Sequence, residues 1–292
     1  MVAPVAIQPR AGRASLEVQL VSGESTVTGS YATNPIKLLA PRARGQSVWA
    51  YTSSFGGGLV AGDQTGLDLR IGCDARCFLG TQASTKIYRN PASLPSGHET
   101  HARLESSSLL VFAPDPVQAF AGSCYTQRQV FRLASDASLV LLDWFTSGRA
   151  ARGERWEFDH VSSRNSVYIE SSRTEEAQSK PAHGELVFLD SLRLDAKDGP
   201  LTTQHRTGRF NCFATLLLLG PSVQAPAEAI LADVNQRPVL RHASLLFAAS
   251  PVRGGAVLRL AAESIEEVTQ ELRQHLARLA PSLGDNPWLR KW

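Results

Sequence analysis

SFGGGLVAGDQTGLDLRIGCDARCFLGTQASTKIYR, residues 54–89, is the stretch that decides the fold. Apolar and polar residues alternate from residue 67 to residue 71, which is the pattern of a β-strand with one buried face. Residues 48–52 precede the glycines and are rich in aromatic and β-branched side chains, which favour strands. A glycine loop is therefore predicted to join two strands, and its glycines are Gly56, Gly57, Gly58 and Gly62.

The glycine loop lacks the features of a phosphate-binding loop. Such a loop leads into the N-terminus of a helix, whereas this one leads into a strand, and its glycine spacing matches neither nucleotide-binding motif. A positive-φ turn or a close approach of two backbones explains the glycines better. Asp63 follows Gly62 directly, and we expect its carboxylate either to cap this turn or to face a cavity.

Outside this stretch the chain is predicted to consist mainly of short strands separated by turns. The strand regions are a hairpin at 15–33, then 101–112, 127–146, 156–171 and 185–195. Within 127–146 the second strand is an unbroken apolar run, which indicates a strand covered on both faces. Two helices near the C-terminus are predicted, at 226–235 and 263–279, from a proline start and from three- and four-residue apolar spacing.

These elements predict an all-β fold class with two short helices late in the chain. We expect one β-rich domain over residues 15–292, after a disordered leader at 1–14, and a mobile polar stretch at 171–183. No fixed-period repeat is visible, so periodicity alone does not predict a solenoid.

Composition excludes several classes of function. The net charge of +3 over 292 residues is small and the basic residues are scattered, which argues against binding nucleic acid. The apolar run at 213–219 is far shorter than the roughly 18 residues that span a membrane. Residues 8–10 interrupt any secretory signal, and four cysteines are too few for a disulfide framework, so we expect a cytoplasmic protein without a membrane partner.

Cysteine and histidine pairs do not predict a metal cage. Cys73 and Cys77 are four residues apart, which is about 13 Å along a strand and too far to chelate one ion, so buried apolar thiols are expected. His98 and His101 are three apart, unlike the helical zinc-protease pair, and are expected to be surface loop histidines.

The signals for hydrolytic catalysis are weak. There is no G-x-S-x-G elbow and no histidine placed to orient a nucleophile. Asp143, Glu154 and Asp159 leave open a hydrolase with paired carboxylates, although strand carboxylates are more often solvated or salt-bridged. Arginines surround Glu154 and predict a local ion network or a contact surface for another protein; they are Arg149, Arg152 and Arg155.

Five blocks of the sequence, in order, closely resemble the UreD family of urease accessory proteins, called UreH in some lineages. They are GGGLVAGDQ (56–64), TQASTKIYR (81–89), PDPV (114–117), LVLLDWFTSGRAARGERWEF (139–158) and ELVFLDSLRL (185–194). The resemblance runs from residue 15 to the ending PWLRKW. Three consecutive glycines stand where proline-glycine-glycine is common in the family, and Cys73 and Cys77 match no functional feature of it.

The resemblance implies a function without catalysis. Proteins of the family are scaffolds that bind apo-urease together with UreF and UreG, so that nickel reaches the urease active site. It also implies a β-helical stack of strands with two helices and an internal channel for nickel in transit, with no permanently bound cofactor. The alternatives are a β-rich hydrolase with carboxylate catalysis and a β-rich binding module without a metal role.

On this resemblance a nickel path would be lined by carboxylates, carbonyls and water, because a cage of thiolates and imidazoles would trap the ion. Asp63, Asp143 and Glu154 are the carboxylates that we expect along it. Structural ion pairs or partner contacts are expected of the nearby basic residues, which are Lys86, Arg89, Arg149, Arg152 and Arg155.

Overall fold

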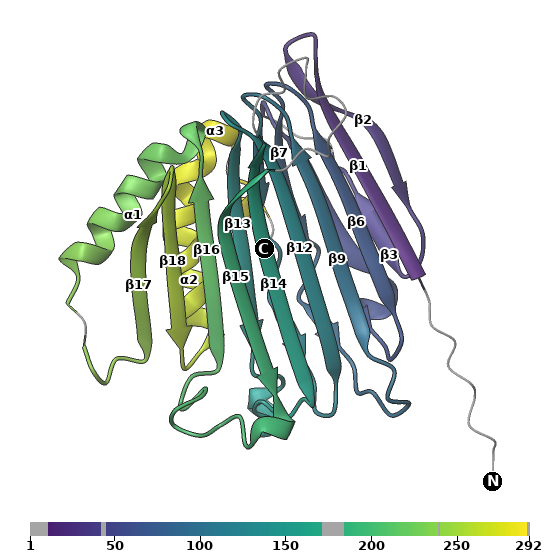
Figure 1. Cartoon of the computed structure of the whole chain (residues 1–292), viewed down its shortest axis with the longest axis vertical. Coiled ribbons are helices and arrows are strands. Elements are labelled where there is room, and N and C mark those ends of the chain that lie inside the picture. Colours follow the sequence, from purple (N-terminus) through teal and green to yellow (C-terminus); the bar gives the residue numbers. More distant parts are fainter. Residues whose placement is uncertain (1–10, 42–44, 171–183, 239, 291–292) are drawn as a thin grey trace.

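The chain winds into a β-solenoid over residues 48–170. The structure is a computed structural model, and it describes residues 11–41, 45–170, 184–238 and 240–290 (Figure 1). Each complete coil has a first strand in the larger sheet, a very short second strand and a third strand in the seven-stranded sheet. The strands of successive coils are β4 (Val48–Ser54), β5 (Gly58–Leu59) and β6 (Gln64–Ile71); β7 (Arg76–Thr81), β8 (Thr85–Ile87) and β9 (Ser96–Leu104); β10 (Leu109–Phe112), β11 (Val117–Ala119) and β12 (Cys124–Ala134); and β13 (Ser138–Thr146) and β14 (His160–Glu170).

Equivalent strands of successive coils pair in parallel and in register. In the seven-stranded sheet, Leu67, Thr100, Gln129 and Asn165 occupy equivalent positions. Their separations along the chain are 33, 29 and 36 residues. Because the coils differ in length, the sequence carries no fixed-period repeat even though the strands stack regularly.

Antiparallel strands extend both ends of the solenoid. At the N-terminal end are β1 (Ala11–Val21), β2 (Glu24–Ala32) and β3 (Ile36–Leu39), of which β1 itself pairs in parallel with β6. At the other end are β15 (Glu185–Asp195), β16 (Cys212–Leu219), β17 (Leu245–Val252) and β18 (Gly255–Ala262). The strand orders are β15-β14-β12-β9-β6-β1-β2 in one sheet and β17-β18-β16-β13-β10-β7-β4-β3 in the other. The parallel coils are thus paired at both ends instead of presenting open edges.

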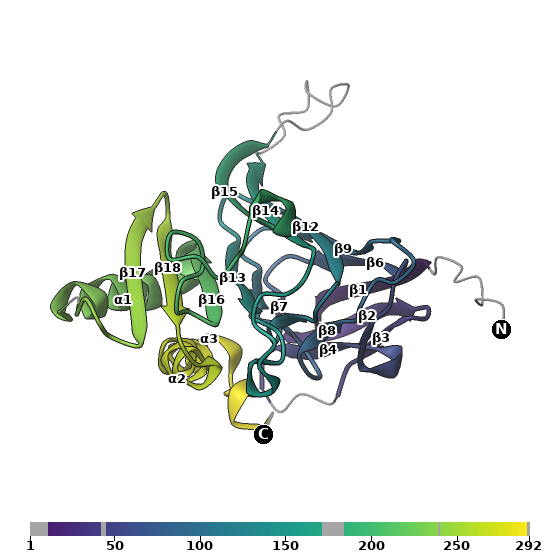
Figure 2. The ribbon, with the colours of Figure 1, turned by 90° about the horizontal axis from the view of Figure 1, so that it is seen from below.

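Helices cover the outer face of the larger sheet, as Figure 2 shows. They are α1 (Gln224–Gln236), α2 (Ile265–Leu276) and the short α3 (Ala280–Leu283). On α2 the buried residues Val268, Leu272 and Leu276 form one stripe at helical spacing, and the Ser264 side chain caps the first turn. The 3₁₀ turns are η1 (Phe55–Gly57), η2 (Ala150–Arg152), η4 (Ala196–Asp198), η5 (Pro221–Val223), η6 (Ala277–Leu279) and η7 (Pro287–Arg290).

Apolar side chains fill two layers. One cluster lies between the two sheets and includes Leu69, Phe131 and Leu141. The other lies between the larger sheet and the helices and includes Trp144 and Leu272.

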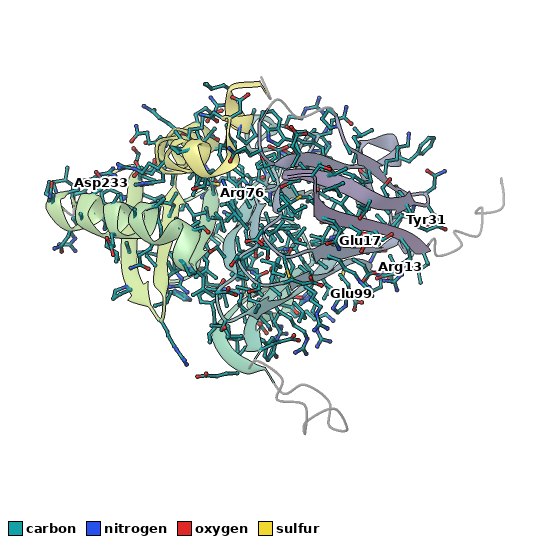
Figure 3. All side chains as sticks on the ribbon, turned by 90° about the horizontal axis from the view of Figure 1, so that it is seen from above. Arg13, Glu17, Tyr31, Arg76, Glu99 and Asp233 are labelled. Atoms are coloured by element: carbon teal, nitrogen blue, oxygen red, sulfur yellow. The ribbon has the colours of Figure 1, made fainter. Side chains whose placement is uncertain are left out.

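Figure 3 shows that Asp233 on α1 and Tyr31 on β2 are at opposite ends of the molecule.

The predicted all-β class with two late helices is confirmed, and α1 and α2 lie where helices were expected. Every residue of β13 is buried, as its apolar run indicated. Strand β1 begins at Ala11, so residues 11–14 of the expected leader are part of it. Residues 1–10 and the stretch 171–183 lie outside the described residues. Within the described part, no helix is long and apolar enough to cross a membrane.

Candidate functional site

A band of polar side chains crosses the interior of the solenoid. Strand alternation directs every second residue of the seven-stranded sheet inward, and two neighbouring inward rows are polar. One row is Thr65, His98, Gln127 and Ser163, and the next is Leu67, Thr100, Gln129 and Asn165, which is polar at three of its four positions. The following row, with Leu69, Ala102, Phe131 and Val167, is apolar. Because the strands stack in register, the polar rows run along the solenoid axis from coil to coil.

Asp143 is the charged centre of this band. It projects from β13 in the opposite sheet and is 7% exposed. Its carboxylate accepts hydrogen bonds from Gln127 Nε2 at 3.0 Å, Ser163 Oγ at 2.7 Å and Asn165 Nδ2 at 2.7 Å. Burial raises the pKa of Asp143, and the hydrogen bonds from the three donors oppose that rise. The carboxylate is therefore desolvated yet supplied with donors.

Further hydrogen bonds connect the band. The Tyr125 hydroxyl donates to Gln127 Oε1 at 3.1 Å, which fixes the amide so that its nitrogen faces Asp143. Gln129 Nε2 donates to Asn165 Oδ1 at 2.7 Å, which orients the Asn165 amide in the same way. These side chains form one network in which a carboxylate is the final acceptor.

His98 lies inside the solenoid, so the expectation of a surface loop histidine was wrong for this residue. It is on β9, with Nδ1 2.7 Å from Thr65 Oγ1 and Nε2 3.0 Å from Thr100 Oγ1. Burial lowers the pKa of His98 to about 4, so the ring is neutral at pH 7. The sequence signal was the alternation of His98 with Thr100, Ala102 and Leu104, which places all four on one strand face. His101, one position out of phase, is exposed as expected.

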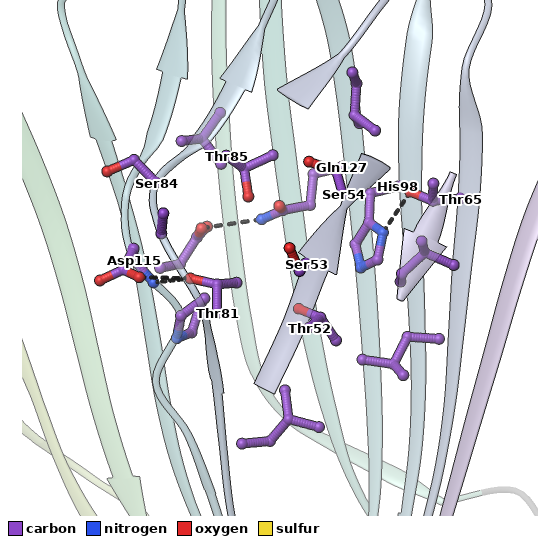
Figure 4. Close-up of a pocket in the computed structure, with 18 of the residues that line it drawn as sticks. Thr52, Ser53, Ser54, Thr65, Thr81, Ser84, Thr85, His98, Asp115 and Gln127 are labelled. Atoms are coloured by element: carbon purple, nitrogen blue, oxygen red, sulfur yellow. Dashed lines mark hydrogen bonds between the residues drawn. The ribbon is translucent and has the colours of Figure 1, made fainter. Parts of the chain in front are cut away.

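A cavity of about 100 Å³ adjoins the band, which is room for a few water molecules (Figure 4). Hydroxyl groups of Thr52, Ser53, Ser54, Thr81, Ser84 and Thr85 line it from the larger sheet and the short strands. Asp115 also lines it, and its Oδ2 accepts from Thr81 Oγ1 at 2.9 Å. Asp143, His98, Gln127 and Gln129 line it from the polar band.

The lining of this cavity suits transient binding of a cation better than catalysis. Its potential ligands are carboxylate, hydroxyl and amide oxygens with one imidazole, and none of the lining residues is a cysteine. Such oxygens hold a divalent transition metal less tightly than thiolates do. The Thr65 and His98 pair is no catalytic dyad, because the second ring nitrogen faces the Thr100 hydroxyl instead of a carboxylate and the low pKa makes the ring a weak base.

Asp143 is the member of the predicted carboxylate trio that lies in the cavity. Asp63 is buried, and its Oδ2 accepts from the backbone N–H of Val60 at 2.9 Å, so it caps the turn at the end of the glycine loop. Glu154 is buried too, and it accepts from the Ala121 N–H at 2.8 Å and from Arg149 Nε at 2.8 Å. Neither Asp63 nor Glu154 is among the residues that line this cavity.

The glycine loop is a strained corner, as expected. Gly56, Gly57 and Gly62 have φ angles of 80°, 75° and 84°, which disfavour other residues. Gly58 is needed for space, because a Cβ there would lie 2.4 Å from the carbonyl oxygen of Lys86. Tight pairing of β5 with β8 therefore depends on the glycine.

The predicted basic residues divide into structural and exposed ones. Arg149 pairs with Glu154, and Arg155 donates to Asn211 Oδ1 and to the Gly208 carbonyl. Arg152 and Arg89 are exposed, and Lys86 is partly buried on β8. Within the described residues none of these last three forms an ion pair within 4 Å.

Cys73 and Cys77 differ in burial. Cys77 is fully buried on β7, and burial raises the pKa of its thiol to about 12. The expectation of burial was wrong for Cys73, which is exposed because it lies in the turn between β6 and β7, where its thiol donates to Glu105 at 3.4 Å.

Fold and cavity together define a β-solenoid protein with a hydrogen-bonded polar interior. The chain belongs to the UreD family: the family model described as UreD urease accessory protein matches residues 10–292. A urease accessory protein UreD of Sorangium cellulosum is 46% identical over 97% of this chain and 85% of its own length. The urease accessory protein D of Arabidopsis thaliana is 34% identical over 93% of this chain and 97% of its own length. The family is one of accessory proteins, which places the chain outside the enzyme classes.

Proposed function

We propose that this chain is a scaffold of urease maturation that binds apo-urease together with UreF and UreG in the cytoplasm and passes nickel towards the urease active site. Family membership supports the role in maturation. Passage of nickel is supported by one observation above all, the buried carboxylate of Asp143 within a continuous polar band.

Stability alone does not account for this band. Taking a carboxylate out of water is costly, and a paired or hydrogen-bonded buried charge is often no better than well-packed apolar side chains. One neighbouring row, with Leu69, Ala102, Phe131 and Val167, is filled with apolar residues in the ordinary way. A polar row through successive coils is therefore explained better by a ligand than by the needs of the core.

The chemistry of the band fits a cation in transit. The buried carboxylates of Asp143 and Asp115 attract Ni²⁺, while amide and hydroxyl oxygens offer weak, exchangeable coordination that allows release. The neutral ring of His98 adds no repulsive charge. Asp143 is thus proposed as the principal nickel contact, with Gln127 and His98 beside it. Asp63 and Glu154 are candidates only for parts of a path beyond this cavity.

Deleting the gene for this chain tests the function. Urease should still be expressed but should contain little nickel and show little activity, as measured by metal analysis and urea hydrolysis. Urease that is fully metallated at ordinary nickel supply would overturn the proposal.

Asp143→Ala distinguishes a nickel path from a scaffold without one. We expect the variant to co-purify with UreF and apo-urease but to leave urease nickel-poor. The exposed Asp159→Ala is a matched control and should activate urease normally. Normal activation by Asp143→Ala would favour a binding module with no metal role.

A further inference from the structure

The outward face of the seven-stranded sheet carries an unusual concentration of arginines. They come from five neighbouring strands: Arg13 on β1, Arg70 on β6, Arg103 on β9, Arg128 and Arg132 on β12, and Arg164 on β14. This is the face turned toward the reader in Figure 1, on the side of the sheet away from the helices. We call it the arginine face.

The arginines stand in rows across the strands. Arg70, Arg103 and Arg132 occupy directly paired positions on three successive parallel strands, and Arg128 is paired in the same way with Arg164. Neighbouring strands are about 4.8 Å apart. Like charges directly opposite each other destabilise a sheet, so these rows oppose folding and call for another explanation.

Other groups of the chain neutralise only some of the arginine charges on this face. Arg103 forms an ion pair with Glu170 at 3.1 Å, and the Arg132 guanidinium lies over the Tyr168 ring at 4.9 Å. Arg70, Arg128 and Arg164 form no ion pair within 4 Å with any residue of the described ranges. Two carboxylates stand in these rows, since Glu17 is paired with Arg70 and Glu99 with Arg128, but neither forms an ion pair with that arginine within 4 Å. Guanidinium groups are thus left available to a partner.

Apolar and aromatic groups border the arginines. A broad groove of about 690 Å³ runs over this face, and Tyr31 on β2 is part of its lining with 59% exposure. Leu186 and Leu189 on β15 are 46% and 45% exposed, beside Tyr168 and Ser166 on β14. Figure 3 shows Arg13, Glu17, Tyr31 and Glu99 together at the N-terminal end of the sheet. Exposed tyrosine and arginine are the residues that dominate protein interfaces.

We propose that the arginine face docks an acidic segment of a partner protein, namely a helix laid across the strands. Carboxylates at positions i and i+4 of a helix are about 5–6 Å apart, close to the spacing between arginines on adjacent strands. Carboxylates interspersed on the face, Glu17, Asp68 and Glu99, divide the positive charge into separate clusters, which suits the discrete carboxylates of a helix better than a continuous phosphate backbone. The site lies on the opposite side of the sheet from the polar band, so it is separate from the proposed nickel path.

The test uses the full chain and a labelled glutamate-rich helical peptide of about 20 residues. Anisotropy titrations compare the wild type with Arg70→Glu/Arg128→Glu and with the control Arg241→Glu/Arg278→Glu, two exposed arginines outside this face. We expect the first double variant to lose about tenfold or more in affinity and the control to bind nearly as the wild type does. Unfolding curves show whether each variant is folded. If Arg70→Glu/Arg128→Glu does not fold, the neutral double variant Arg70→Gln/Arg128→Gln is used in its place.

Two results would overturn the proposal. One is that the peptide fails to bind the wild type, or that both double variants weaken it equally. The other is that a DNA duplex of matched length and charge binds more tightly than the peptide, which would make the face a nucleic-acid surface. Neither result bears on urease activation by Asp143 variants, so the proposed function is tested independently of the arginine face.

Discussion

Asn165 on β14 donates a hydrogen bond of 2.7 Å from Nδ2 to Oδ2 of Asp143 on β13, so a charged hydrogen bond joins the two sheets through the interior of the solenoid. These strands belong to the same coil and are separated by the loop that contains Glu154. A structural core would place apolar residues at both positions, as it does one row away at Val167. The bond shows that the polar band spans the interior from sheet to sheet.

The raised pKa of Asp143 predicts a pH dependence of stability. Because burial raises the pKa of Asp143, the folded state binds a proton more readily than the unfolded state does, so this residue favours folding most at low pH and loses that contribution as the pH rises through its raised pKa. We expect the unfolding free energy of the wild type, minus that of Asp143→Asn, to fall as the pH rises above about 4. Denaturant titrations at several pH values measure it, and a difference that rises with pH would contradict the assignment.

His98 predicts the opposite trend. Because burial lowers its pKa to about 4, the stability due to the neutral ring is complete above pH 6.5 and is lost as the pH falls towards 4. Relative to His98→Gln, the wild type should lose about 2 kcal/mol over this range, less than the full shift because the ring borders a cavity with room for water. The exposed His101→Gln serves as the control and should follow the wild type. Equal acid sensitivity of all three proteins would show that His98 is hydrated in solution.

The glycine loop predicts unequal costs for two alanine substitutions. Gly58→Ala would place Cβ against the Lys86 carbonyl and the Tyr88 ring, and we expect a loss of about 3 kcal/mol. Gly56→Ala meets nothing within 4 Å and suffers only from its positive φ, so about 1 kcal/mol is expected. Thermal or denaturant unfolding measures both. A greater loss for Gly56→Ala would mean that β5 and β8 are less closely paired than in the structure.

Asp63 allows a capping role to be separated from a metal-binding one. Asp63→Ala removes the acceptor for the Val60 N–H and should cost about 1 kcal/mol, whereas Asp63→Asn keeps an acceptor and removes the charge. If the residue only caps the turn, Asp63→Asn should activate urease normally and Asp63→Ala should lose stability. If Asp63→Asn is stable but leaves urease nickel-poor, the charge of Asp63 is needed for nickel transfer and the residue belongs to the nickel path.

Much of the fold was visible in the alternation of the sequence. The pattern predicted the strands, the buried faces of β13 and the two helices, because local spacing determines which side chains share a face. The coiling was not visible, because coils of unequal length leave no repeat. Similarly, the inward position of His98 follows from alternation once β9 is known to be a strand, whereas the strand itself was expected to begin only at residue 101.

Which carboxylate enters the cavity depended on contacts between distant residues. Asp63 and Glu154 resemble Asp143 in sequence context, since each follows a strand or lies in a strongly matching block. Asp63 accepts from Val60 in the same turn, and Glu154 accepts from Arg149, five residues away, and from the more distant Ala121 N–H. The hydrogen-bond donors to Asp143 come from β12 and β14 in the opposite sheet. They could not be assigned without knowing how the strands of successive coils pair.

The most direct test of the polar band replaces two bonded partners together. Gln129→Leu alone would leave Asn165 Oδ1 buried without its donor, at a cost of about 1–3 kcal/mol. Gln129→Leu/Asn165→Leu removes both partners of this bond, but it also takes the Asn165 Nδ2 donor from Asp143, so the double variant is expected to lose about 1–3 kcal/mol of stability. The double variant should unfold at a lower temperature than the wild type but still fold and co-purify with the same partners, while urease activated with it contains less nickel. If the double variant co-purifies with its partners as a folded protein, a loss of nickel transfer cannot be attributed to misfolding. Full activation of urease by a stable double variant would mean that nickel does not travel along the polar band.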